Sequence, residues 1–136
     1  LYGTVYFVNA VAPYMKEQRS GKIVTVASTA GLRASRDGGY AHYGAAKAGI
    51  AHYTRYLAQE LGPHGVTVNS ISPSMVDTDL VSNIPERMRQ MTVSRTPLRR
   101  LATADDVAGA ALMLASPYAS FITGENMLVT GGEHMI

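Results

Sequence analysis

The sequence has no cysteine and no long apolar run. Without cysteine among its 136 residues, the chain can form neither disulfides nor thiolate metal sites, and it has no cysteine nucleophile. This absence fits a reducing compartment, and we expect a cytoplasmic location. The longest apolar stretch, around residues 107–115, is about half of the roughly 18 residues that a membrane-spanning helix needs. We therefore expect no membrane association.

Charge is also scarce. Charged residues make up 16% of the chain, below the roughly 25% of an average domain, and 46% of the residues are apolar. These values predict one globular domain with a core and exclude wholesale disorder. The net charge of +2 gives little support to a nucleic-acid partner.

Positive charge is concentrated in one segment. It holds five arginines, Arg87, Arg89, Arg95, Arg99 and Arg100, next to a single acid, Glu86. We interpret the segment as a solvated, partly helical surface, because no aromatic residues interleave for base stacking. A phosphate-bearing substrate or an acidic carrier is the alternative, and nucleic-acid binding would show a steep dependence on salt.

The residue pattern alternates between helix and strand. Apolar residues at helical spacing predict helices, and β-branched runs with little charge predict strands that are buried on both faces. The predicted helices span residues 1–19, 42–61, 85–91 and 103–114, and the predicted strands span residues 22–28, 66–72 and 126–130. Residues 74–101 are otherwise irregular, and a loop of this length is usually functional. This order predicts an α/β fold with three adjacent parallel strands and helices on both faces, which is half of a doubly wound, Rossmann-like sheet.

The third long helix and the chain start carry clear local signals. Thr103 precedes Asp106 by three residues, which is a capping box at the start of the last helix. The chain begins at Leu1 already within an amphipathic pattern, which we interpret as a chain entered within a helix. No basic region followed by a cleavage site is present, so we expect no signal peptide.

One helical turn carries a candidate acid. Tyr43 and Lys47 are four residues apart on a predicted helix, hence on one face, with small residues between them and room for a ligand above. A nearby positive charge favours the phenolate form and makes a phenol a usable acid or base near neutral pH. Alone, this spacing is also typical of ordinary surface residues.

Ser28 stands at the end of the first predicted strand. Ligands in open α/β sheets bind beyond the carboxyl ends of the strands, where Ser28 and Tyr43 could donate to one substrate oxygen. The alternative for Ser28 is a hydroxyl that caps the following loop, and the residues alone leave both interpretations open.

These residues, taken with others along the chain, resemble the short-chain dehydrogenase/reductase superfamily. The resemblance rests on strand 23–28 with Thr29-Ala30-Gly31, on Tyr43 to Lys47, on Asn69 to Pro73 with Thr78, and on Thr123-Gly124 before Val129 to Gly132. It covers essentially the whole chain, and the order and spacing of the pieces make chance a poor explanation. Within the superfamily the chain is similar to the classical type, which includes the 3-oxoacyl carrier-protein reductases.

The resemblance implies hydride transfer between a nicotinamide cofactor, NAD or NADP, and a ketone or secondary alcohol. Tyr43 is implied as general acid or base, Lys47 as its partner and a ligand of the cofactor ribose, and Ser28 as the holder of the substrate oxygen. The implied cofactor-binding residues are Tyr43, Lys47, Pro73, Ser74, Val76 and Thr78. The implied substrate-binding residues are Ser28, Ala30, Tyr40 and Met75. Tyr40 is a second phenol, but the residue four positions on is Gly44, so we expect Tyr40 only to line the site.

The resemblance also implies partners. Helices 1–19 and 42–61 would form a dimer interface and the last strand a second one, so a homodimer or homotetramer is expected. Methionines in the segment that would cover the substrate, Met75, Met88 and Met91, favour an adaptable apolar lid on a pocket for a medium-sized apolar carbonyl compound; plain core packing is the alternative. The four histidines, His42, His52, His64 and His134, lack metal-ligand spacing, so we expect no metal.

The sequence departs from the family pattern at several places. Tyr43 lies fifteen positions after Ser28, which lengthens the intervening loop by two residues against the family's usual spacing. Ser74 replaces a common glycine, and Thr130 stands where an acid often precedes the final glycine pair. Asn9 lies too late on the first helix to match the family's catalytic asparagine, and we interpret it as a surface residue.

The glycine-rich turn that binds the cofactor phosphates has no counterpart in these residues. We therefore expect residues 1–136 to be the C-terminal catalytic portion of one such domain, inactive without an N-terminal dinucleotide-binding portion. The rival hypothesis is a non-catalytic binding or assembly module that keeps the fold.

Overall fold

The structure is a computed structural model that describes residues 1–34 and 38–135. Its centre is a parallel sheet in the order β1 (Gly21–Val26), β2 (Val66–Pro73) and β3 (Asn126–Val129). The register pairs Gly21 with Val66 and Ser70 with Asn126 at the start of each ladder. The predicted three-stranded parallel sheet is therefore confirmed. The loop-length prediction falls partly on residues 35–37, outside the described residues.

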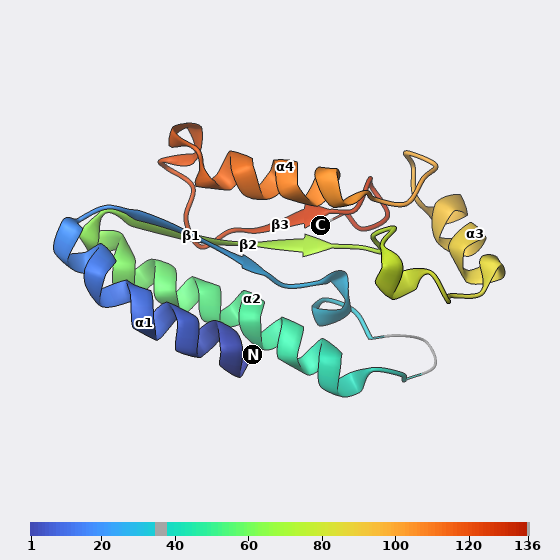
Figure 1. The fold of residues 1–136 in the computed structure, drawn as a ribbon, viewed down its shortest axis with the longest axis horizontal. Helices are drawn as coiled ribbons and strands as arrows, with labels where there is room; N and C mark the ends of the chain where they lie inside the picture. Colours follow the sequence, from blue (N-terminus) through green and yellow to red (C-terminus); the bar gives the residue numbers. More distant parts are fainter. Residues whose placement is uncertain (35–37, 136) are drawn as a thin grey trace.

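Helices cover both faces of this sheet, as the alternating pattern predicts (Figure 1). The helices α1 (Tyr2–Gln18) and α2 (Ala41–Leu61) lie on one face, and α4 (Ala104–Ala115) lies on the other. Because the strand order in the sheet follows the chain order, helices on opposite faces (Figure 1) give the β1–β2 and β2–β3 crossovers opposite hands. None of the helices within the described residues is long and apolar enough to cross a membrane.

The two faces have separate apolar cores because side chains alternate along β2. Val68 points towards α1 and α2, where it packs in a cluster with Val8, Ile23, Leu57 and Leu61. Ile71 points the other way and packs with Leu114 of α4 and with Ala119. Leu61 and Leu114 are fully buried. These clusters fix the position of each helix along the sheet. They therefore also fix where the strand ends lie relative to the helices.

The sheet also buries a polar group of three side chains. The hydroxyls of Ser70 and Ser72 both donate to Asn126 Oδ1, at 2.7 and 2.8 Å. All three side chains are buried. A buried hydroxyl without a partner is costly, so this arrangement ties β2 to β3 through side chains as well as through the backbone.

Most element ends lie within one residue of the predictions, and three differences have a local reason. Strand β1 stops at Val26 and not at residue 28, because Ser28 caps the short 3₁₀ helix η1 (Thr29–Gly31). The backbone after α2 stays helical through η2 (Gly62–His64), because a proline in the first turn needs no hydrogen-bond donor. Helix α3 (Glu86–Arg95) extends four residues past the predicted end at Met91, since Pro97 is the first residue that blocks it.

Candidate active site

Ser28 caps η1 at the carboxyl end of β1. Its backbone is extended, and its Oγ accepts a hydrogen bond from the Ala30 N–H at 3.2 Å. Capping of this kind uses an acceptor lone pair of the hydroxyl and leaves its proton available for donation. The two interpretations of Ser28 are therefore compatible, because the cap fixes the side chain that would hold a substrate oxygen.

The η1 turn packs backbone to backbone against the start of α2, and two glycines permit this approach. A Cβ on Gly31 would lie 2.5 Å from Ala48 N and 2.7 Å from Lys47 C, and a Cβ on Gly44 would lie 2.9 Å from Ala30 O. The Ala30 carbonyl fills the space beside Gly44, and room for a ligand above the face that carries Tyr43 and Lys47 stays a prediction.

Lys47 joins α2 to the end of β1. Its Nζ donates to Val26 O at 2.8 Å and lies 5.6 Å from the centroid of the Tyr43 ring. An ammonium has three donors, so this bond leaves donors for a further ligand. The Tyr43 side chain is 43% exposed and thus reachable from solvent. The structure therefore brings Tyr43 and Lys47 onto one turn, directly beside the η1 turn that Ser28 caps.

The proposed cofactor residues follow the neighbouring strand. Pro73 is the last residue of β2 and is buried, Ser74 and Val76 are half-buried, and Thr78 is exposed. The Ser74 N–H donates to Val129 O at 3.2 Å, which ties this segment to the end of β3. Because β1 and β2 are parallel neighbours, residues 73–78 leave the sheet at the same edge as Ser28.

The proposed substrate residues lie around this edge with different exposure. Ala30 and Met75 are half-buried, on η1 and just after β2. Tyr40 is 76% exposed and takes a left-handed backbone (φ 60°) where α2 begins. Met88 and Met91 lie on α3 and are also exposed. These positions agree with a role at the mouth of a site, and the assignments remain predictions.

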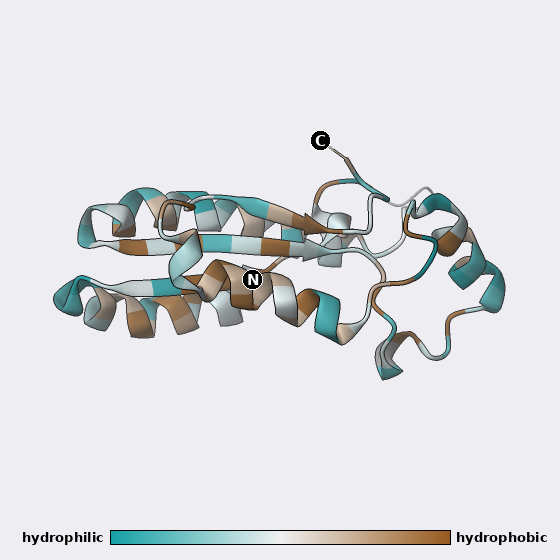
Figure 2. Ribbon diagram, turned by 90° about the horizontal axis from the view of Figure 1, so that it is seen from above, coloured by the Kyte–Doolittle hydropathy of each residue, from teal (hydrophilic) through white to brown (hydrophobic). Residues whose placement is uncertain are grey.

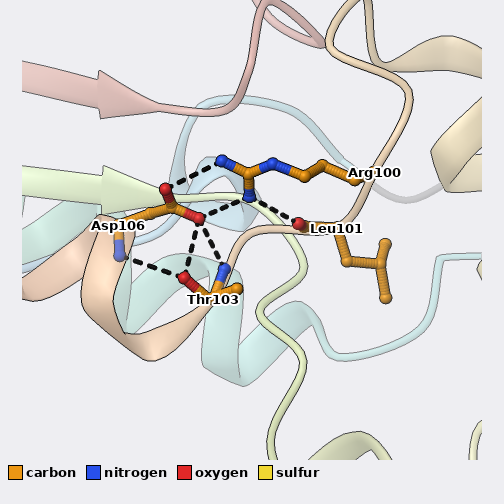
Figure 3. A network of polar contacts seen from close by, with 4 residues as sticks. All are labelled: Arg100, Leu101, Thr103 and Asp106. Atoms are coloured by element: carbon orange, nitrogen blue, oxygen red, sulfur yellow. Dashed lines mark hydrogen bonds and ion pairs between the residues drawn. The ribbon is translucent and has the colours of Figure 1, made fainter.

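Two of the five clustered arginines have acidic partners that sequence reasoning missed. Arg100 pairs through both terminal nitrogens with Asp106, at 2.5 and 2.9 Å, and Thr103 completes the predicted capping box on the same carboxylate (Figure 3). The hydrogen bonds from Arg100, followed by those from Thr103, hold the pKa of Asp106 well below its usual range. Arg89 pairs with Asp77 at 2.6 Å.

Asn9 lies on the helix surface, as the sequence predicts. Asn9 is exposed on α1, where its Oδ1 accepts a long hydrogen bond from Tyr53 OH at 3.5 Å. Across residues 1–34 and 38–135, the structure holds no group of three or more histidine, cysteine or acidic side chains that could bind a metal ion.

Comparison with known proteins identifies the family. Residues 1–134 match the profile of the family described as enoyl-(acyl carrier protein) reductase. The chain belongs to this family, within the short-chain dehydrogenase/reductase superfamily. It is 49% identical over 133 residues to a cyclohexanol dehydrogenase of Rhodococcus sp. (strain TK6), a match that covers 97% of this chain and 49% of the relative.

Solved structures show the same fold. A 3-oxoacyl-[acyl-carrier protein] reductase from Brucella melitensis ATCC 23457 matches with a TM-score of 0.94 and 38% identity, over 100% of this chain and 50% of that one. A second reductase of this kind from Brucella melitensis, with bound NAD, matches with a TM-score of 0.89 and 38% identity, over 100% and 49%. The chain thus spans about half the length of the curated relatives it matches.

Proposed function

We propose that this chain carries the catalytic end of an NAD(P)-dependent oxidoreductase that interconverts a ketone and a secondary alcohol. The observation that carries the proposal is the packing of the Ser28 turn against the Tyr43 to Lys47 turn at the carboxyl edge of the sheet. The bound NAD of a 38% identical reductase and the cyclohexanol dehydrogenase activity named for a relative support it.

The residues present fit a nicotinamide cofactor chemically. Lys47 retains ammonium donors and Tyr43 has a hydroxyl, so the two can hold ribose hydroxyls, while residues 73–78 provide an apolar and hydroxyl-bearing border for the nicotinamide ring. The cofactor, when bound, supplies or accepts the hydride.

The chain's own residues handle the oxygen and its proton. Ser28 donates a hydrogen bond to the substrate oxygen and orients the carbonyl. Tyr43 gives its proton to that oxygen as reduction makes it an alkoxide, and in oxidation it takes the proton back. The Lys47 ammonium stands 5.6 Å from the centroid of the Tyr43 ring, on the same helical turn as the phenol that transfers the proton.

We further propose a homodimer or homotetramer in the cytoplasm. Several aromatic side chains on α1 are largely exposed, which is typical of a surface that another chain covers. They are Tyr2, Tyr6, Phe7 and Tyr14, each at least 68% exposed. The cytoplasmic location rests on the lack of cysteine. Size-exclusion chromatography with light scattering tests the assembly.

The test of the activity uses the complete gene product with NAD(H), NADP(H) and a panel of cyclic and acyclic ketones and secondary alcohols. We expect Tyr43→Phe to lower kcat by about 100-fold or more. The control is Tyr118→Phe, a fully solvated phenol on the 3₁₀ helix after α4, which should leave kcat unchanged. A Tyr43→Phe variant with normal activity contradicts the mechanism, and no turnover of any carbonyl or alcohol favours a non-catalytic binding module.

A further inference from the structure

The two ends of the segment between β2 and α4 are bonded to each other through their backbones, and we call this paired base the neck. Val76 pairs with Ala102 in an isolated parallel bridge. The Asp77 N–H donates to Ala102 O at 2.8 Å, and the Ala102 N–H donates to Met75 O at 3.3 Å. Both ends of the segment are thus fixed to each other, and residues 78–101 form the part beyond the neck.

Helix α3, which lies beyond this neck, has little to hold it. It has no buried side chain. Figure 2 shows it as a mostly hydrophilic helix that stands apart at one end of the molecule, and Figure 1 places it beyond the carboxyl ends of the strands. An element with so few buried apolar contacts opens easily unless a specific contact restrains it.

One ion pair supplies such a contact. Arg89 Nη2 lies 2.6 Å from Asp77 Oδ1. The Arg89 side chain is only 25% exposed, whereas Arg87 and Arg95 on the same helix are exposed. The Asp77 backbone is hydrogen-bonded to Ala102 in the neck. The Asp77–Arg89 ion pair therefore links the weakly packed helix α3 to the neck. Glu86 Oε2, 3.9 Å from Arg89 Nε, adds a weaker attraction within the helix.

We propose that Asp77 and Arg89 are positioning residues that hold α3 at the carboxyl edge of the sheet and thereby set the affinity for substrate. This inference rests on the proposed function, which places the substrate at that edge. The pair does not touch the reacting atoms and acts through the position of the covering segment. Its loss therefore lowers the population of the closed segment and leaves the chemistry of the closed state unchanged.

Arg89→Gln in the complete gene product tests this. A partly exposed ion pair shifts an equilibrium by about three- to fivefold, so we expect KM to rise by that factor while kcat changes less than about twofold. Amide hydrogen exchange across residues 86–95 should accelerate by a similar factor. Arg87→Gln is the matched control, because it removes the same charge from the same helix at a position with no ion pair in the described structure. It should change neither readout.

A charge reversal separates this pairing from a general loss of structure. Asp77→Arg and Arg89→Asp should each raise KM and speed exchange, and the double variant should restore both towards the wild-type values. In 1 M salt, which shortens the screening length to about 3 Å, the wild type should approach Arg89→Gln.

The inference is overturned if Arg89→Gln exchanges like Arg87→Gln, if its kcat falls while KM stays constant, or if the folded double variant recovers neither readout. The exchange measurement needs no turnover, so it decides whether the pair restrains α3 even where the proposed activity fails.

Discussion

Replacement of Gly31 by alanine is the sharpest test of the site as described. A Cβ there would stand 2.5 Å from Ala48 N and 2.7 Å from Lys47 C, whereas ordinary contact begins at 3.4 Å. Both atoms belong to the backbone of α2, which cannot rotate away as a flexible side chain can. The η1 turn must therefore move by about 1 Å from the helix, and overpacking of this kind costs typically 1–3 kcal/mol.

The same displacement should impair catalysis more than it impairs folding. The turn that moves is capped by Ser28, and the helix it moves from carries Tyr43 and Lys47. A misplacement of about 1 Å between cooperating groups can lower the rate by about 100-fold. We therefore expect a folded Gly31→Ala protein that loses about 1–3 kcal/mol of stability and about 100-fold in kcat.

Urea unfolding and steady-state kinetics on the same preparation measure both effects. Gly109→Ala is the control, because a Cβ at Gly109 in α4 meets open space and should stabilise the helix by about 0.5–1 kcal/mol with kcat unchanged. If Gly31→Ala unfolds at the wild-type urea concentration, η1 does not need this close approach. If it is destabilised but turns over normally, the contact does not position Ser28 for catalysis.

The architecture could be predicted because its signals are local. The β-branched run of residues 22–28 and the uncharged β2 segment mark strands buried on both faces, and helices between them force a parallel order. The capping box from Thr103 to Asp106 is equally local, and the structure shows it. Once the strands are parallel, their carboxyl ends share one edge, which puts Ser28 near the start of α2.

The contacts that fix the site could not be predicted, because they depend on distances that only the folded chain defines. From the sequence, Arg89 has one acidic neighbour, Glu86, but in the structure its close partner is Asp77, twelve residues away across the neck of the segment. Gly44 is explained by the Ala30 carbonyl that packs against it, a contact that no spacing in the sequence shows. Likewise, a strand buried on both faces buries Ser70, but only the register with β3 shows which oxygen its hydroxyl meets.

Two further predictions concern buried and charged polar groups. Asn126→Ala removes the acceptor of the Ser70 and Ser72 hydroxyls, so we expect it to cost about 1–3 kcal/mol for each hydroxyl left unsatisfied, measured by urea unfolding; a loss near zero means that both find other acceptors. The second concerns acid stability, since the folded pKa of Asp106 lies below its usual range through Arg100. A lowered pKa adds stability that is present above the unfolded value near 4 and is lost as the pH falls from there towards the folded value. The asparagine of the Asp106→Asn variant cannot titrate. At pH 7 the wild type should therefore have the higher Tm, and the gap in Tm between the two proteins should close as the pH falls below 4. A gap that stays constant down to pH 2 contradicts the assignment, because the carboxylate would then contribute through its shape alone and not through its charge.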